Sequence, residues 1–164
     1  MGERRGRITG HHGHLERGTI LRRITSYRDH LLNLIDLELE HEMEVLTDRL
    51  ENWSKQRLTS TGTALFDLDA RTSGWLFSER IIALRSKGAR LPDHRFGHGD
   101  MVRLSRGRPL DEWTDGVVLD RDYRSIRVVV SEPPKDLKRG VWRIDRGANR
   151  VAHDRMRTAI ERMC

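Results

Sequence analysis

The chain has 164 residues, of which 31 are basic and 25 acidic, a net charge of +6 and a single cysteine, Cys164. One cysteine excludes a disulfide framework, and no apolar run approaches the roughly 20 residues of a membrane span. The N-terminal residues lack the apolar stretch of a signal peptide. We therefore expect one small domain with an appendage and no membrane partner. We expect it in the reducing cytoplasm, or in the nucleus if the source is eukaryotic.

Residues 1–18 are rich in Gly, Arg and His and have no periodicity, so we expect a disordered basic tail there. The letters HHGH, His11 to His14, fall in this tail. A metal site needs fixed geometry and usually mixed ligands, and we expect no metal site in the chain.

From Thr19 the apolar residues follow helical spacing. The stripe consists of Leu32, Ile35, Leu39, Met43, Leu46, Leu50 and Trp53, spaced as in a helix that buries one face. Acidic residues fill the positions between them, and residues 24–58 carry eight acidic and four basic groups. The pattern predicts a long amphipathic helix over 19–57, whose acidic face is either solvated or a docking surface for a protein.

The period changes to two between residues 59 and 147. Six short runs alternate apolar and polar residues, at 61–72, 75–87, 101–106, 116–122, 125–132 and 140–147. Turn residues separate them, which is typical of a small antiparallel barrel of the SH3 or OB type. We expect Val102, Leu104, Val128 and Val130 to face its interior, and Arg103 and Ser105 to face outward.

After Gly147 the helical spacing returns, with Ala152, Met156, Ala159 and Met163 on one stripe. This predicts a C-terminal helix over 149–164 that packs antiparallel to the first helix and forms a stalk with it. The predicted fold class is therefore α+β, a six-stranded antiparallel β-barrel flanked by a long N-terminal helix and a C-terminal helix.

The segment LPDHRFGHGDMVRLSRG, residues 91–107, carries a family resemblance. A PxxxFxxGDxVxLS pattern is matched by Pro92, Phe96, Gly99, Asp100, Val102, Leu104 and Ser105. Residues 141–163 match the return from barrel to stalk. In order and spacing, residues 25–163 resemble the stalk and β-barrel insertion of Upf-like superfamily-1 helicases of the immunoglobulin mu-binding protein type. A glycine-rich TGLGG segment of that family is replaced here by residues 72–76, TSGWL.

The resemblance implies an accessory nucleic-acid-binding region of a superfamily-1 DNA/RNA helicase, with the helicase motor domains as partners in cis. The sequence contains no GxxxxGK[ST] phosphate loop, so we expect a fragment, a truncated product or a stand-alone relic without the motor. We expect no catalytic residue and no cofactor in the chain, because ATP and Mg²⁺ belong to the motor. The alternative function is an SH3-like protein-interaction module with an acidic docking helix.

Outward arginines on the third and fifth strands and their adjoining turns are the predicted nucleic-acid contacts: Arg103, Arg106, Arg108, Arg124 and Arg127. Arginines that contact phosphates contribute affinity without sequence specificity, so the predicted partner is single-stranded DNA or RNA, bound weakly and without sequence preference. The alternative is that these arginines only keep the strands soluble. Trp75, Trp113 and Trp142 are candidates either for base stacking or for barrel packing, and we expect only Trp113 to be exposed.

Overall fold

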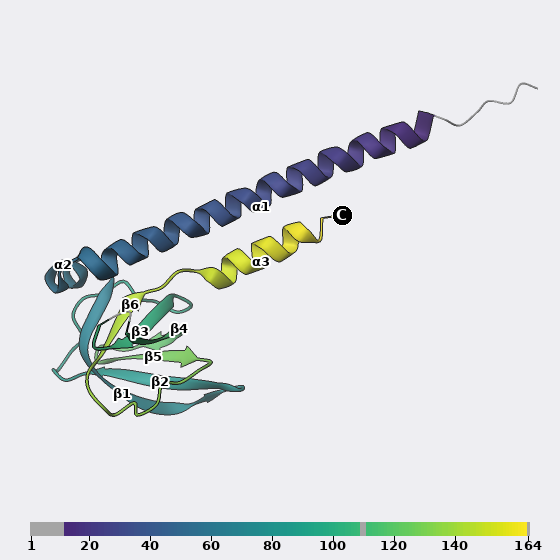
Figure 1. Ribbon diagram of the computed structural model, residues 1–164. Helices are drawn as coiled ribbons and strands as arrows, with labels where there is room; N and C mark the ends of the chain where they lie inside the picture. The colour runs from purple at the N-terminus through teal and green to yellow at the C-terminus, as the bar shows by residue number, and fades with distance from the viewer. Residues whose placement is uncertain (1–11, 109–110, 164) are drawn as a thin grey trace, which may run out of the picture. The chain divides into compact units, whose positions relative to one another are not determined.

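A computed structural model describes residues 12–108 and 111–163 (Figure 1). In this part of the chain the helices are α1 (His12–Asn52), α2 (Lys55–Ser60) and α3 (Arg150–Glu161). The strands are β1 (Ala64–Leu76), β2 (Glu79–Ser86), β3 (Met101–Arg106), β4 (Glu112–Arg121), β5 (Ser125–Val130) and β6 (Trp142–Arg146). None of the described helices is both long and apolar enough to cross a membrane. The chain divides into two units, residues 1–39 with 151–164, and residues 40–150.

The first unit contains the N-terminal part of α1 and most of α3. An ion pair joins Asp36 of α1 to Arg157 of α3, and Arg157 also pairs with Glu161 at 3.2 Å. Ile35 and His153 are buried in this unit. The ion pair therefore lies between two helices that run antiparallel (Figure 1).

Helix α1 begins and ends earlier than the sequence predicts. It starts at His12, inside the segment expected to be a tail, and ends at Asn52 rather than near residue 57. The chain turns at Ser54, whose Oγ accepts a hydrogen bond from the backbone N–H of Arg57 at 3.1 Å. Such an N-cap satisfies a free donor at a helix start, so α2 begins as a new helix. Residues 1–11 of the expected tail lie outside the described residues.

The six strands close into a barrel in the order β1-β2-β5-β4-β3-β6. Every neighbouring pair is antiparallel, and β6 closes the ring by pairing with both β1 and β3. The predicted six-stranded antiparallel barrel is thus confirmed. Strand order matters for the site, because β4 separates β3 from β5.

Inward-facing apolar side chains fill the barrel. The largest fully buried ones are Leu65, Leu68, Ile82, Leu84, Phe96, Val102, Leu104, Val118, Ile126, Val128, Trp142 and Ile144. The four predicted core residues on β3 and β5 are all buried, which confirms the inward face of both strands. Gly116 lets β4 approach β5 closely, since a Cβ there would lie 2.5 Å from Cγ1 of Val128.

The hairpin between β1 and β2 differs from the prediction. β1 continues to Leu76, and the turn consists of residues 77 and 78, with Leu76 opposite Glu79. The sequence predicts a first strand over 61–72 and a second over 75–87. The boundary at residue 72 is wrong, because β1 continues through a shift in register between Thr72 and Gly74, where Gly74 has a φ of 127°. A bulge of this kind bends a strand without ending it.

Candidate nucleic-acid interface

Arg103 lies on the outer face of β3 and is held there by two neighbours. The register sets it opposite Asp115 of β4, and its Nε donates to Oδ1 of Asp115 at 3.1 Å. The guanidinium stacks on Trp113, 3.8 Å from the ring centre. The Arg103 side chain is only 16% exposed, so little of its charge faces solvent.

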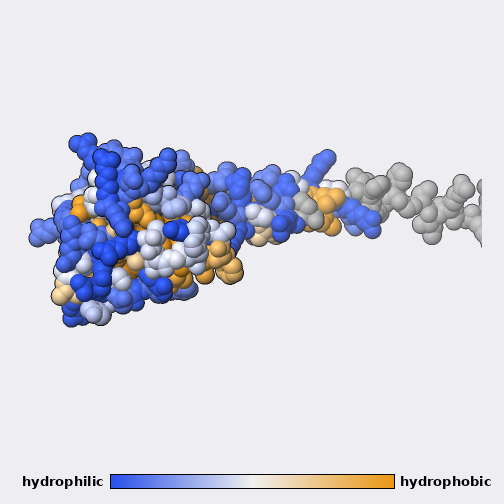
Figure 2. Space-filling view, turned by 90° about the horizontal axis from the view of Figure 1, so that it is seen from below, coloured by the Kyte–Doolittle hydropathy of each residue, from blue (hydrophilic) through white to orange (hydrophobic). Residues whose placement is uncertain are grey.

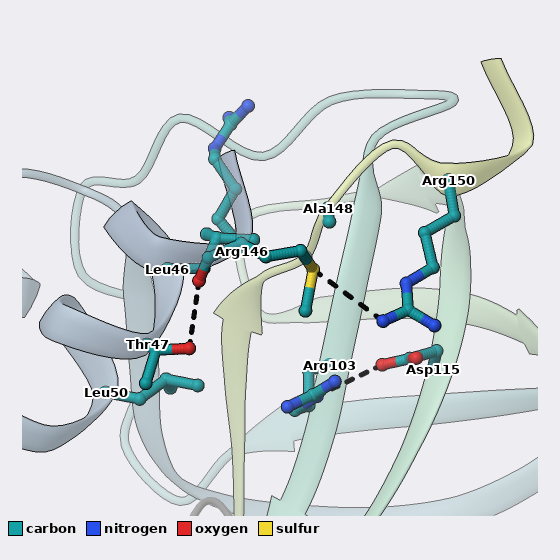
Figure 3. A pocket seen from close by; sticks show the side chains of 10 residues that line it. Leu46, Thr47, Leu50, Arg103, Asp115, Arg146, Ala148 and Arg150 are labelled. Atoms are coloured by element: carbon teal, nitrogen blue, oxygen red, sulfur yellow. Dashed lines mark hydrogen bonds and ion pairs between the residues drawn. The ribbon is translucent and has the colours of Figure 1, made fainter. Parts of the chain in front are cut away.

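The C-terminal part of α1 covers this face of the barrel. Met43, Leu46 and Leu50 of α1 line a cavity of about 30 Å³ together with Arg103 and Asp115 (Figure 3). A cavity of that size has room for water but not for a nucleotide. It therefore belongs to the packing between helix and barrel.

The link from β6 to α3 is attached to the same part of α1. The backbone N–H of Asn149 donates to Oε1 of Glu42 at 3.2 Å, and a guanidinium nitrogen of Arg150 lies 3.8 Å from Sδ of Met43 (Figure 3). Met43 and Arg150 also belong to the lining of the small cavity.

Arg106, at the end of β3, is used to hold a loop. It forms a two-pronged ion pair with Glu112, with Nε 3.0 Å from Oε2. Its Nη1 donates to the carbonyl oxygens of Asp136 at 2.8 Å and Arg139 at 3.0 Å. Arg106 thus ties the loop between β5 and β6 to β3.

Arg127 on β5 is paired but more open. Its Nε donates to Oδ1 of Asp120 on β4 at 2.7 Å, and a second ion-pair contact joins the same groups. The hydrogen bond from Arg127 lowers the pKa of Asp120 below its ordinary value, and the same bond raises the pKa of Arg127. The Arg127 side chain remains 40% exposed.

The two remaining predicted arginines lie in turns. Arg108 is exposed. Arg124 is half-buried, and its buried Nε has no hydrogen-bond partner among the described residues. Oδ1 of Asp122 shapes the same turn by accepting from the backbone N–H groups of Arg124 at 2.7 Å and Ser125 at 2.8 Å. These bonds lower the pKa of Asp122.

The five predicted arginines therefore do not form one open surface. β4 lies between the strands that carry them, and its carboxylates Glu112, Asp115 and Asp120 each pair with one arginine. Nucleic-acid binding by these arginines stays a prediction, and of the three strand arginines only Arg127 keeps an appreciably exposed side chain.

Ser105 is predicted to face outward, but it is not exposed. It is fully buried, and its hydroxyl has no hydrogen-bond partner in the described part of the chain. The reason is its position between Trp113 and Arg143 on the flanking strands, whose large side chains stand on either side.

Arg143 and Asp145 form a buried ion pair on β6. Nε of Arg143 donates to Oδ2 of Asp145 at 2.6 Å, and the side chains are 14% and 3% exposed. Burial raises the pKa of Asp145, while Arg143 and then Arg103 act in the opposite direction. Asp145 lies opposite Arg103 in the register of β3 and β6, so the ion pairs Arg103–Asp115 and Arg143–Asp145 are neighbours on this face.

Two exposed aromatic residues lie at the β1–β2 hairpin, and of these only Trp75 is among the candidates that the sequence predicts for base stacking. Trp75 is 62% and Phe77 97% exposed, whereas Trp113 is 45% exposed and Trp142 is buried. The prediction that only Trp113 is exposed was therefore wrong. The available signal was the apolar run WLF beside a turn, which the sequence analysis assigned to the interior of a strand.

A groove of about 720 Å³ lies between β1 and the loop that follows β5. Its lining consists of Arg71, Thr72, Pro134, Asp136, Leu137, Lys138 and Arg139. Three of these side chains are basic and one is acidic, and none of the three bases has an ion-pair partner among residues 12–108 and 111–163. The barrel face seen in Figure 2 combines apolar and hydrophilic surface.

A second groove, of about 480 Å³, lies beside the β4–β5 turn. Its lining includes two arginines and two aspartates, together with the exposed ring of Tyr123, so its charges are balanced. His94 also lines it, and its pKa is lowered by burial and then by Arg121. No group of metal-ligating side chains occurs among the residues that the structure describes.

One family model matches the chain. Its description is Helicase SMUBP-2/HCS1, 1B domain, and the match spans residues 29–141. No curated protein matches the chain. The matched range takes in more than half of the chain and includes β1 to β5. It also includes the groove lined by Arg71, Lys138 and Arg139, called the basic groove below.

Proposed function

The chain belongs to the Helicase SMUBP-2/HCS1, 1B domain family and is an accessory region of a superfamily-1 helicase, and on this premise we propose that its barrel binds single-stranded nucleic acid. The binding is weak and independent of sequence, and the ligand is DNA or RNA. In this proposal the helicase motor domains are its partners in cis, and ATP and Mg²⁺ bind to the motor rather than to the barrel.

The observation that supports this proposal is the basic groove beside β1. Arg71, Lys138 and Arg139 line it without carboxylate partners in the described part of the chain, so their charges are free to meet phosphates. Contacts to phosphates carry affinity but no sequence information. The exposed Arg108 and the partly exposed Arg127 extend the basic surface in this proposal.

The expected strength follows from how few charges are free. If about two to four phosphates are neutralised, the logarithm of the association constant falls with the logarithm of salt concentration with a slope of about −1.5 to −3. Such binding is marginal at physiological salt. It would add to the affinity of a motor domain for the same nucleic-acid strand rather than replace that affinity.

The test is fluorescence anisotropy of labelled single-stranded oligonucleotides, DNA and RNA of mixed sequence, titrated with the full chain at several salt concentrations. We expect binding at low salt with the slope given above and similar affinities for unrelated sequences. A chain that binds neither oligonucleotide at the lowest salt would contradict the proposal and favour a protein-interaction module.

The matching control concerns ATP. The sequence has no phosphate loop, so we expect no ATP hydrolysis by the chain, with or without oligonucleotide. Turnover that survives rigorous purification would contradict this part of the proposal.

A further inference from the structure

The tip of the β1–β2 hairpin carries a feature that folding does not explain. Phe77 is the first residue of a two-residue turn, and its φ of 54° lies in the region that favours glycine. Two-residue hairpin turns with a positive φ at this position usually have glycine there. An aromatic residue in such a conformation costs stability.

No contact among the described residues offsets that cost. The Phe77 side chain is 97% exposed, so its ring contributes no buried area to the barrel. Glycine would suit the turn better, and a small polar side chain would keep the tip soluble. A strained and fully exposed aromatic side chain is a reason to look for a ligand.

A second exposed aromatic ring lies close by on the same strand. Trp75 pairs across the hairpin with Arg80, whose guanidinium lies 4.4 Å from the centre of the indole ring. Arg80 has no ion-pair partner among the described residues, and the nearby carboxylate of Glu79 accepts a hydrogen bond from Oγ of Ser131 at 2.6 Å. The Arg80 guanidinium therefore packs on the Trp75 ring, and its positive charge is not neutralised by a carboxylate among the described residues.

The hairpin tip and the basic groove both include residues of β1, a few positions apart. Trp75 follows the groove residue Thr72 by three positions on β1, which is about 10 Å along an extended strand. A ligand held by Arg71, Lys138 and Arg139 would therefore reach the aromatic tip. Flat rings beside unpaired cations suit unstacked bases on a phosphate chain, which is how single strands are held without sequence preference.

We propose that the β1–β2 hairpin tip is a base-stacking platform for single-stranded nucleic acid, with Trp75 and Phe77 stacking on bases and the groove contacting their phosphates. This inference rests on the proposed function and names the part of the barrel that meets the bases. A duplex would bind less well, because its bases are already stacked.

The decisive variant is Phe77→Gly, because it removes the ring and suits the positive φ of the turn. We expect it to fold at least as stably as the parent in urea denaturation, while its affinity for a single-stranded oligonucleotide falls about fivefold or more. Trp75→Thr should weaken binding similarly. The matched control is Tyr123→Ser, which removes a ring that is 68% exposed beside the other groove and should leave affinity unchanged.

A strand of abasic sites separates stacking from charge, because it keeps the phosphates and lacks the bases. The parent should bind the abasic strand at least about fivefold more weakly than the normal strand, whereas Phe77→Gly should show a smaller difference. Equal binding of the normal strand by the parent, Phe77→Gly and Trp75→Thr would overturn the platform and leave the proposed function standing. A parent that binds no strand would overturn both.

Discussion

Two arginine–tryptophan pairs of the barrel, Arg103 with Trp113 and Arg80 with Trp75, differ in what surrounds them. Arg103 stacks on Trp113 and also pairs with Asp115, under the C-terminal part of α1. Arg80 stacks on Trp75 at an exposed hairpin without an ion-pair partner among the described residues. The carboxylate directly across the strand decides whether such an arginine stabilises the fold or stays available for a ligand.

The largest effect should come from breaking the buried ion pair of Arg143 and Asp145 on β6. Asp145→Ala leaves Arg143 without its partner in a place where its side chain is only 14% exposed. Removing one member of a buried pair typically costs about 3–5 kcal/mol, and we expect that loss in the free energy of unfolding measured with urea.

The control for this experiment replaces both members. Arg143→Met with Asp145→Leu leaves no buried charge unpaired, so the double variant should recover most of the stability. If Asp145→Ala lowers the free energy of unfolding no more than Asp120→Ala, whose ion pair with Arg127 is exposed, burial would not distinguish the two ion pairs in the way described above.

The next effect tests the barrel core at β3. Leu104→Ala should lower the free energy of unfolding by about 2–5 kcal/mol, because the removed methyl groups lie in a fully buried site and leave a cavity. The comparison variant is Phe77→Ala at the exposed tip, which removes no buried area. A loss below about 1 kcal/mol for Leu104→Ala would mean that β3 is not anchored in the core as described.

The barrel could be predicted from the sequence because apolar and polar residues alternate along much of each strand. Alternation on β3 and β5 assigned Val102, Leu104, Val128 and Val130 to the interior, and all four are buried. The end of the first strand at residue 72 was misjudged because the bulge between Thr72 and Gly74 interrupts the alternation. Only the register with the partner strand shows that β1 continues to Leu76.

The binding residues were harder to predict, because alternation assigns a side chain to a face but not to a neighbour. It gave Arg103 to the outer face, yet that face lies against α1. The acidic partners on β4 come from pairing between strands, and no count of charges reveals them. Two of the three groove bases, Lys138 and Arg139, belong to an irregular loop, for which no periodicity exists.

A smaller effect should separate the two sets of arginines in solution. Lys138→Gln combined with Arg139→Gln removes two unpaired charges of the groove, so the salt slope for a single strand should become flatter by about 1.4. Arg103→Gln should leave the slope unchanged, because Asp115 already neutralises that charge. A flatter slope for Arg103→Gln alone would show that Arg103 contacts phosphate, as the sequence predicts, and would weaken the distinction between the faces.

The smallest effect concerns the ion pair of Asp120 and Arg127, which lies between the two extremes of exposure. The hydrogen bond from Arg127 lowers the pKa of Asp120 below its ordinary value of 3.8. A lowered pKa in the folded state means that the stabilisation is complete above the ordinary value and is lost as pH falls through the folded value. Asp120→Asn should therefore be less stable than the parent at pH 7, by less than about 1 kcal/mol for an exposed pair. The difference should vanish in acid, where both proteins carry a neutral group, as measured by urea denaturation across the acid range.

Arg127→Gln should remove the same pH dependence, because it takes away the donor that lowers the pKa. If the gap between the parent and Asp120→Asn stays constant down to the lowest pH, the pair contributes through packing and not through charge, and Arg127 would then be as free to meet a phosphate as Arg108.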